Sequence, residues 1–493
     1  MKHGFSSQLA EKFAKRFYEF PSGSMPSDDA LSLYESHAES IERIIESIII
    51  VGSHPWEDDR TPKLLYCSSS NPTNDDKMLA DFCFPNGKTE IHKKVFSRPD
   101  LVLSHIFQDP NKIKFDFFTF YFPSNDSAPY AFCSGYEAST FTFPTFAHNL
   151  TKKQVFDSFK NNTLYTTKIF ICIRTKFPFD ELFQMFAKWI LQSEHIGRMN
   201  IYQESNIKFN SNLQTVSNQT VSNGETSFLF QDWPQSQRRK ITVVFGRILN
   251  IIPPVPGRDV SFDIEPFPLF TWQRPSLNGG SYLPLAWNSL SMAIQLISPD
   301  LFLKIFKAVC LERTIIVYHD DMANVTNFLL ALIFALKPMR WVSGFISILP
   351  DKLKDMLDSP SPLMIGMVEP LHEVYSGHVY VDLKKRNITS VEKIEKMKLI
   401  DELLPFLKKN WKPENVSEIL NRLNDIMQTI INNVEKSIVS NLSKAQVTSN
   451  FVEELFLCYF DSGSKEFLEQ MCVSQMFRFL VEQMCKMKSD MNK

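Results

Sequence analysis

Glycine, net charge and long apolar runs are all scarce in this sequence. Its 493 residues include 15 glycines, less than half of an average usage of about 7%, which disfavours chemistry built on glycine-rich phosphate loops. The 53 basic and 55 acidic side chains nearly cancel, so no global field attracts nucleic acid or an anionic membrane. The longest strongly apolar run, Phe328 to Leu336, falls far short of the ~20 residues that span a bilayer. We therefore expect a cytoplasmic protein that binds no nucleic acid.

Motifs for covalent, metal or nucleotide chemistry are also missing. The chain has no GxSxG, HExxH or GxGxxG, and its eight cysteines are dispersed without CxxC spacing, which predicts reduced core thiols rather than a metal site. The stretch Gly87-Lys88-Thr89 resembles the end of a P-loop, but the position for its first glycine is Phe82, and Pro85 has no N–H to offer a phosphate. We expect no cofactor, and a strand end at Phe82 to Phe84 followed by a turn at 85–87.

The first residues have a helical apolar stripe. Phe5, Leu9, Phe13 and Phe17 recur every four residues, with basic side chains on the other faces. Packing against the protein body is the commoner fate of such a stripe, and peripheral membrane contact through residues 1–20 is the alternative.

Two patterns of secondary structure follow in order. Short runs rich in Ile, Val, Phe and Tyr, such as KLLYC and KIFICIRT, predict strands up to about residue 175, and FDELFQMFAKWI predicts a helix. From 287 onward helical and strand patterns alternate through RTIIVY, MANVTNFLLALIFALK and PLMIGMV, which predicts a parallel, doubly wound sheet. After about Glu392 the pattern is mainly helical.

Two polar clusters deserve a chemical interpretation. His319-Asp320-Asp321 follows the strand RTIIVY, where doubly wound sheets usually place ligands. Capping of the next helix by Asp320 or Asp321 is the favoured alternative, because Asp accepts from free helix N–H groups. His372 and His378 could pair on a metal, but no third ligand is suggested.

Residues 311–367 resemble the central part of the DENN domain family. The matching features are Leu311-Glu312-Arg313 before a strand, Pro338-x-x-Trp341, Ile348-Leu349-Pro350, and Asp358-Ser-Pro-Ser-Pro leading to Ile365-Gly366. ESIIIVG, PKLLYC, FCFPNG, PYAFC and ICIRTKFPFDELF resemble the upstream region of the family, and Ser474 to Phe479 resembles the downstream region. The resemblance extends over about residues 42 to 485.

This resemblance implies an α/β, bilobal fold. An N-terminal longin-like lobe of sheet plus helix would be followed by a doubly wound α/β lobe finished by helices. The expected divisions are an N-terminal arm and linker (1–40), an upstream DENN lobe (41–200), a flexible connection (201–227), a central DENN α/β domain (228–375) and a mainly helical downstream DENN region (376–493).

The resemblance also implies a guanine nucleotide exchange factor, which binds the switch regions of a Rab-family GTPase and promotes GDP release in membrane traffic. No catalytic residue and no metal are expected. Asp358 and Ser359, with Trp341, Pro360 and Pro362, are the candidate partner contacts, although Trp and Pro at strand ends more often set the fold.

Two alternatives stay open at this stage. A GTPase-activating subunit would need an arginine finger, for which Arg60 and Arg98 are candidates. A catalytically silent scaffold in a longin-DENN complex would need neither arginine.

Overall fold

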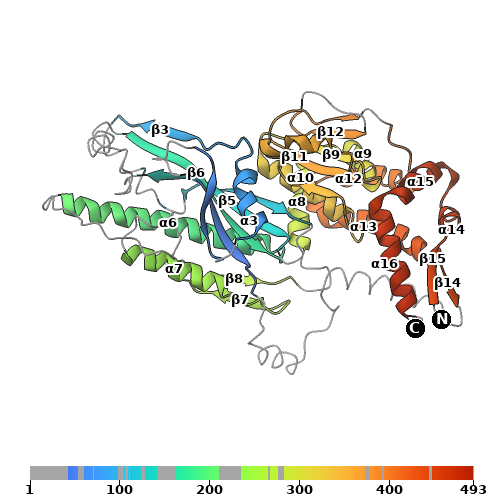
Figure 1. Ribbon diagram of the computed structural model, residues 1–493, viewed down its shortest axis with the longest axis horizontal. Helices are drawn as coiled ribbons and strands as arrows, with labels where there is room; N and C mark the ends of the chain where they lie inside the picture. The colour runs from blue at the N-terminus through green and yellow to red at the C-terminus, as the bar shows by residue number, and fades with distance from the viewer. Residues whose placement is uncertain are drawn as a thin grey trace, which may run out of the picture.

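The described residues of the computed structural model form two large β-sheets, two two-stranded sheets and a C-terminal group of helices. The two large sheets and the C-terminal helices succeed one another along the long axis of the molecule (Figure 1). None of the helices within the described segments is long and apolar enough to cross a membrane. The N-terminal stripe lies outside the described residues, as do residues 210–227 of the predicted connection 201–227; residues 201–209 form the end of helix α6 (Asp180–Phe209). The structure describes residues 43–53, 60–69, 72–97, 101, 105, 109, 112–123, 128–140, 163–209, 235–264, 267–275, 282–371, 377–390, 393–442 and 447–491.

The first sheet is antiparallel, with strand order β2-β1-β6-β5-β4 and β3 also paired to β6. Alternation along β5 and β6 places Phe132 and Phe170 on opposite faces. Phe132 contacts Phe183 of the long helix α6, whereas Phe170 contacts Phe84 beyond helix α3. One helix therefore covers each face of the sheet. The strands are β1 (Ser47–Gly52), β2 (Lys63–Cys67), β3 (Ile91–Val95), β4 (Asp116–Tyr121), β5 (Tyr130–Thr140) and β6 (Thr163–Thr175).

The segment Phe82 to Phe84 corrects one prediction. It is not a strand end, because Phe82 and Cys83 close helix α3 (Asn74–Cys83). The cause is a capping box: Thr73 accepts from the backbone of Asp76, and the Asp76 side chain accepts from the backbone of Thr73. The predicted turn is confirmed, since Gly87 N–H donates to the Phe84 carbonyl over 2.8 Å and Gly87 has a φ of 64°.

Aromatic contacts attach the next segment to the first sheet's helix α6 (Asp180–Phe209). Phe179 lies 5.0 Å from Trp272, and Phe186 lies 5.4 Å from Phe262, between ring centroids. The segment comprises α7 (Gln235–Leu249), β7 (Asp259–Phe262) and β8 (Phe270–Gln273). Its packing is thus with the first sheet, although the domain division at 228 remains a prediction.

The second sheet has the order β10-β11-β9-β12-β13. The first four strands are parallel, as the alternating pattern predicts, and β13 adds an antiparallel edge. Asp321 is the N-cap of α10 and accepts from Ala323 N–H over 2.9 Å, which confirms the expected cap. The elements are α8 (Leu283–Leu296), α9 (Pro299–Cys310), β9 (Thr314–Tyr318), α10 (Met322–Ala335), β10 (Gly344–Ile346), the 3₁₀ helix η5 (Asp351–Asp358), β11 (Leu363–Met367), β12 (His378–Asp382) and β13 (Asn387–Ser390).

The C-terminal part is mainly helical, as expected, with an added hairpin of β14 and β15. It is attached to the second sheet by the buried Glu312, whose carboxylate accepts from Met476 N–H over 3.0 Å and from the Ser343 hydroxyl. The elements are α11 (Lys398–Asp401), α12 (Leu404–Asn410), η6 (Pro413–Asn415), α13 (Val416–Lys436), β14 (Ile438–Leu442), β15 (Val447–Phe451), α14 (Glu453–Leu457), η7 (Ser462–Ser464), α15 (Lys465–Val473) and α16 (Gln475–Met491).

All eight cysteines are free thiols, and five of them are buried. Cys458 is exposed, so the prediction of a core thiol is wrong at that position. Its neighbour Tyr459 also faces solvent, with 43% of its surface exposed, whereas Phe456 on α14 points into the core.

Candidate partner-binding surface

The two sheets meet edge to edge at β4 and β10. The Tyr121 N–H donates to the Ser347 hydroxyl oxygen over 3.0 Å, and the Tyr121 ring makes an edge contact with Phe345 at 5.5 Å between centroids. Arg340 donates to the Pro123 carbonyl over 2.6 Å. Both strands are sheet edges, and they meet through this side-chain hydrogen bond and ring contact rather than through a backbone ladder.

A second contact between the two parts joins α3 to η5. Asp351 N–H donates to the Pro85 carbonyl over 2.9 Å, and Lys352 Nζ lies 2.6 Å from Asp81 Oδ1. The turn at 85–87 therefore lies against the start of η5. This places the upstream FCFPNG stretch beside the central ILPDKL stretch, although they are far apart in the sequence.

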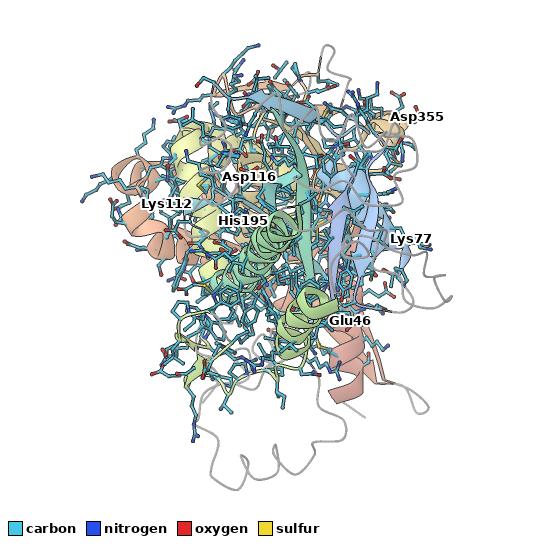
Figure 2. All side chains as sticks on the ribbon, turned by 90° about the vertical axis from the view of Figure 1, so that its left-hand side faces the viewer. Glu46, Lys77, Lys112, Asp116, His195 and Asp355 are labelled. Atoms are coloured by element: carbon cyan, nitrogen blue, oxygen red, sulfur yellow. The ribbon has the colours of Figure 1, made fainter. Side chains whose placement is uncertain are left out.

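These elements form one continuous surface, which we call the α3–η5 surface. It comprises the outer face of α3, the turn 85–87, η5 and the loop 359–362. Figure 2 shows Lys77 of α3 and Asp355 of η5 on the same side of the molecule. Met78 and Met356 are each 37% exposed on these two helices, and methionine suits adaptable binding surfaces because its side chain is flexible and polarisable.

Charged side chains border this surface. Lys354 lies 2.8 Å from Asp351 and 3.4 Å from Glu369. The hydrogen bond to Asp351 raises the pKa of Lys354, and Glu369 adds to the effect. These exposed pairs contribute little to stability, so their charges are available for a partner.

The loop after η5 holds most of the candidate contacts predicted from the sequence. Asp358 and Pro360 are exposed, and Ser359 and Pro362 are half-buried. Ser361 N–H donates to Ser359 Oγ over 3.2 Å, which orders the loop locally. These residues therefore lie together at the surface, next to η5.

Trp341 is placed differently from the other candidates. Its side chain is 2% exposed, and its indole N–H donates to the Gly344 carbonyl over 3.1 Å. The ring is thus part of the core below β10 and has little surface to offer a partner.

Of the two arginine-finger candidates, the structure describes Arg60 but not Arg98. Arg60 is exposed, and its carbonyl accepts from the backbone N–H of Thr89 over 2.9 Å, close to the turn 85–87. Arg98 lies outside the described residues.

The predicted histidine pair is described only in part, because His372 also lies outside the described residues. His378 is buried at the start of β12, where burial lowers its pKa.

Behind the β4–β10 contact lies a cavity of about 330 Å³ between β4, β5, α6, α8 and α10. Its most buried charged group is Asp180, which accepts from Gln184 Nε2 over 2.8 Å and from Asn288 Nδ2 over 2.9 Å. Burial raises the pKa of Asp180, and the two amide donors oppose that effect. Each oxygen of this carboxylate thus has one amide donor, and the bond from Asn288 connects α6 to α8.

Sequence reasoning did not find the pairings that build this surface. Tyr121 and Ser347 are 226 residues apart, and no local pattern indicates that two edge strands will meet. The capping box before α3 was a usable signal, because Thr73 precedes Asp76 by three residues.

The comparison with known proteins finds a family match over the region that contains most of the second sheet. Residues 208–386 match the DENN (AEX-3) domain. A stretch of 156 residues is 29% identical to the DENN domain and WD repeat-containing protein SCD1 of Arabidopsis thaliana, a distant relative. That match covers 31% of this chain and 13% of the relative.

Proposed function

We propose that this chain, which carries a DENN domain in residues 208–386, is a guanine nucleotide exchange factor for a Rab-family small GTPase in membrane traffic. The DENN family is associated with this activity. The observation that carries the proposal is the DENN match over the second sheet, beside a surface that joins this sheet to the first one. In the proposed arrangement the protein is bilobal, with the first sheet and its helices as a longin-like lobe.

Exchange of this kind needs no catalytic side chain. Sub-nanomolar GDP binding is worth more than about 12 kcal/mol, and the exchange factor must stabilise the nucleotide-free GTPase to a comparable degree. Linkage makes the effect reciprocal, so GDP must also weaken binding of the factor. The chain therefore has to supply a large interface that holds the switch loops in an altered conformation.

Interface size favours contacts from both lobes. Stable protein interfaces bury about 1,200–2,000 Å² in total, which is more than a five-residue loop provides. The α3–η5 surface joins the loop to α3 through the Asp351–Pro85 and Lys352–Asp81 contacts. We infer that Asp358, Ser359, Pro360 and Pro362 contact the GTPase at one side of this surface and that α3 contacts it at the other.

The test uses a panel of Rab GTPases loaded with fluorescent GDP, with release followed against excess GTP. The full chain should accelerate release from at least one member. Asp358→Arg should then lower the catalytic efficiency about tenfold or more, equivalent to about 1.4 kcal/mol. Asp425→Arg is the matched control, because Asp425 is also exposed but lies on α13; it should leave exchange unchanged.

Two results would contradict the proposal. If no Rab released GDP faster, the proposed exchange activity would be wrong. If Asp358→Arg and Asp425→Arg had equal effects, the proposed contact site at Asp358 would be wrong.

The activating alternative is kept because Arg60 is exposed near the turn 85–87. It predicts accelerated phosphate release that Arg60→Ala abolishes. A silent scaffold predicts binding without either acceleration. Peripheral membrane contact through residues 1–20 also remains a proposal, tested by vesicle sedimentation of the chain with and without residues 1–40.

A further inference from the structure

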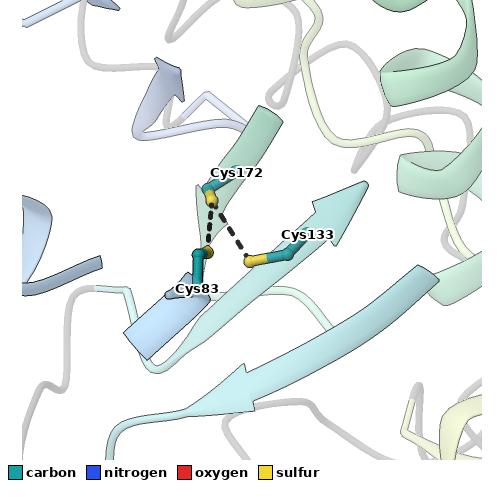
Figure 3. Close-up of side chains that lie close together, drawn as sticks. All are labelled: Cys83, Cys133 and Cys172. Carbon is teal, nitrogen blue, oxygen red and sulfur yellow. Dashed lines mark hydrogen bonds between the residues drawn. The ribbon is translucent and has the colours of Figure 1, made fainter. Parts of the chain in front are cut away.

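Three cysteines that are far apart in the sequence meet inside the first lobe. Cys172 Sγ lies 3.2 Å from Cys133 Sγ and 3.8 Å from Cys83 Sγ, and all three sulfurs lie within 4.8 Å of one another (Figure 3). Cys133 and Cys172 are directly opposite in the β5–β6 register, and Cys83 ends α3 above them. Each is at most 2% exposed.

The spacing of the sulfurs fits a metal centre with three thiolate ligands. A metal–sulfur bond is about 2.3 Å long, so three sulfurs arranged trigonally around one ion stand about 4 Å apart. The two shorter separations, 3.2 and 3.8 Å, lie just below that value. Small side-chain rotations would therefore open a position for an ion between the sulfurs.

The surroundings favour a soft ion of low coordination number. Within the described part of the chain, these cysteines are the one set of three or more His, Cys, Asp or Glu side chains with ligand atoms this close, and no fourth such ligand joins them. Zn²⁺ in structural sites is almost always tetrahedral and takes four ligands. Cu(I) prefers thiolates and is satisfied by three of them.

A buried guanidinium, itself paired with two carboxylates, lies near the cluster. Arg174, two residues beyond Cys172 on β6, is 1% exposed and lies 3.5 Å from Asp75 and 3.6 Å from Asp76. Burial raises the pKa of Cys172, but hydrogen bonding with Cys133 and Cys83 and the charge of Arg174 outweigh it and lower the pKa. Burial raises the pKa of Cys83 and of Cys133. The cysteines bind a metal ion as thiolates, so their protons leave when the ion binds.

We propose that Cys83, Cys133 and Cys172 bind one Cu(I) ion as three thiolate ligands. The ion ties the end of α3 to the two central strands of the first sheet and so holds the turn 85–87 against η5. It enters as the chain folds, because the folded sulfurs are closed to solvent.

The test uses the reduced full chain, with Cu(I) supplied through a chelator strong enough to keep it from isolated thiols. After refolding and desalting, elemental analysis should find one copper per chain, and X-ray absorption should find three sulfur neighbours. The copper-loaded chain should also unfold at a higher temperature than the chain refolded without metal.

Matched variants locate the site. Cys172→Ala should lose the copper, whereas Cys310→Ala should keep it, because Cys310 is an equally buried thiol on α9. Cys83→Ala serves as a second variant at the end of α3, where loss of the side chain leaves both strands intact. Circular dichroism of each variant separates loss of the ion from loss of the fold.

Three outcomes would overturn the proposal. These are less than half an equivalent of copper in the parent chain, equal loss in Cys310→Ala, or retention of Zn²⁺ in preference to Cu(I). A chain lighter by two hydrogens and free of metal would assign the pair Cys133 and Cys172 to a disulfide instead.

Discussion

Some residues of the DENN pattern make contacts that a substitution would disrupt. Gly366 is the clearest case, because a Cβ atom there would stand 2.1 Å from the Ser347 carbonyl oxygen and 2.4 Å from Val325 Cγ1. Glu312 is another, since its buried carboxylate joins the start of α16 to the segment before β10. Each of these two residues ties one element to another.

Gly366→Ala should therefore destabilise the protein by about 1–3 kcal/mol, since overpacking against a backbone oxygen cannot be relieved by a rotamer change. Urea unfolding measures the effect. The control is Gly246→Ala in α7, where nothing lies within 4 Å of the added methyl; it should be neutral or slightly stabilising. Similar losses at both positions would show that the close approach in the structure is not limiting.

Helix α10 depends on its cap in the same way that α3 depends on its capping box. Asp321 accepts from the otherwise unpaired N–H of Ala323, while its neighbour Asp320 makes an exposed ion pair with Lys384 at 2.8 Å. The hydrogen bond to Lys384 lowers the pKa of Asp320. The two adjacent acids thus have different roles: Asp321 caps helix α10, and Asp320 forms an ion pair at the surface.

At this scale we expect Asp321→Ala to cost about 0.5–2 kcal/mol, as for other N-caps. Asp320→Ala should be less damaging, because an exposed ion pair contributes little to stability. Thermal unfolding of both variants under identical conditions gives the comparison. If Asp320→Ala were the more damaging change, the assignment of the cap would be wrong.

Among the described residues, the larger hydrophobic core extends from β1 to α16 and includes side chains from both sheets, and a smaller cluster lies on the other face of the second sheet. The contact of β4 with β10 and the Lys352–Asp81 ion pair also join the two parts of the protein. Because the core is continuous, the relative position of the two sheets is set by packing rather than by the connecting segment. A partner that binds across the α3–η5 surface would therefore meet a preformed shape.

A double-mutant cycle measures that coupling. Tyr121→Ala and Phe345→Ala should each destabilise the protein, and together they should cost about 0.5–1.5 kcal/mol less than the sum of the single changes, because the ring pair is lost only once. Tyr121→Ala combined with Phe451→Ala on β15 should be additive, since Phe451 contacts Phe456 and Phe477 instead. Additivity in both cycles would mean that the junction contributes nothing.

Much of the fold was predictable from local patterns. Strand and helix periods between 287 and 367 predicted the parallel sheet and its helices, and Asp321 was foreseen as a cap. Helix α3 was missed because Phe82-Cys83-Phe84 has β propensity, whereas the capping box at Thr73 and the burial of Leu79 and Ala80 decide for a helix. The hairpin β14–β15 was missed as well.

Single residues of the candidate site were predictable from the sequence, but their arrangement was not. Asp358 and Ser359 were chosen from the loop pattern, and they do lie at the surface. Trp341 matches the family pattern equally well but is buried, since a motif does not distinguish a residue that holds a strand from one that meets a partner. Lys352 and Asp81 carried no signal, because each is an ordinary charged residue until the two segments meet.

The sequence by itself determined most of the element types, the cap of α10 and the match of residues 208–386 to the DENN domain, because these depend on periodicity and on residues close together in the chain. Tertiary structure alone decided the contact between β4 and β10, the α3–η5 surface and the convergence of Cys83, Cys133 and Cys172. These depend on strand register and on which sheet edges remain open, and such contacts form between segments whose separation leaves no trace in local composition.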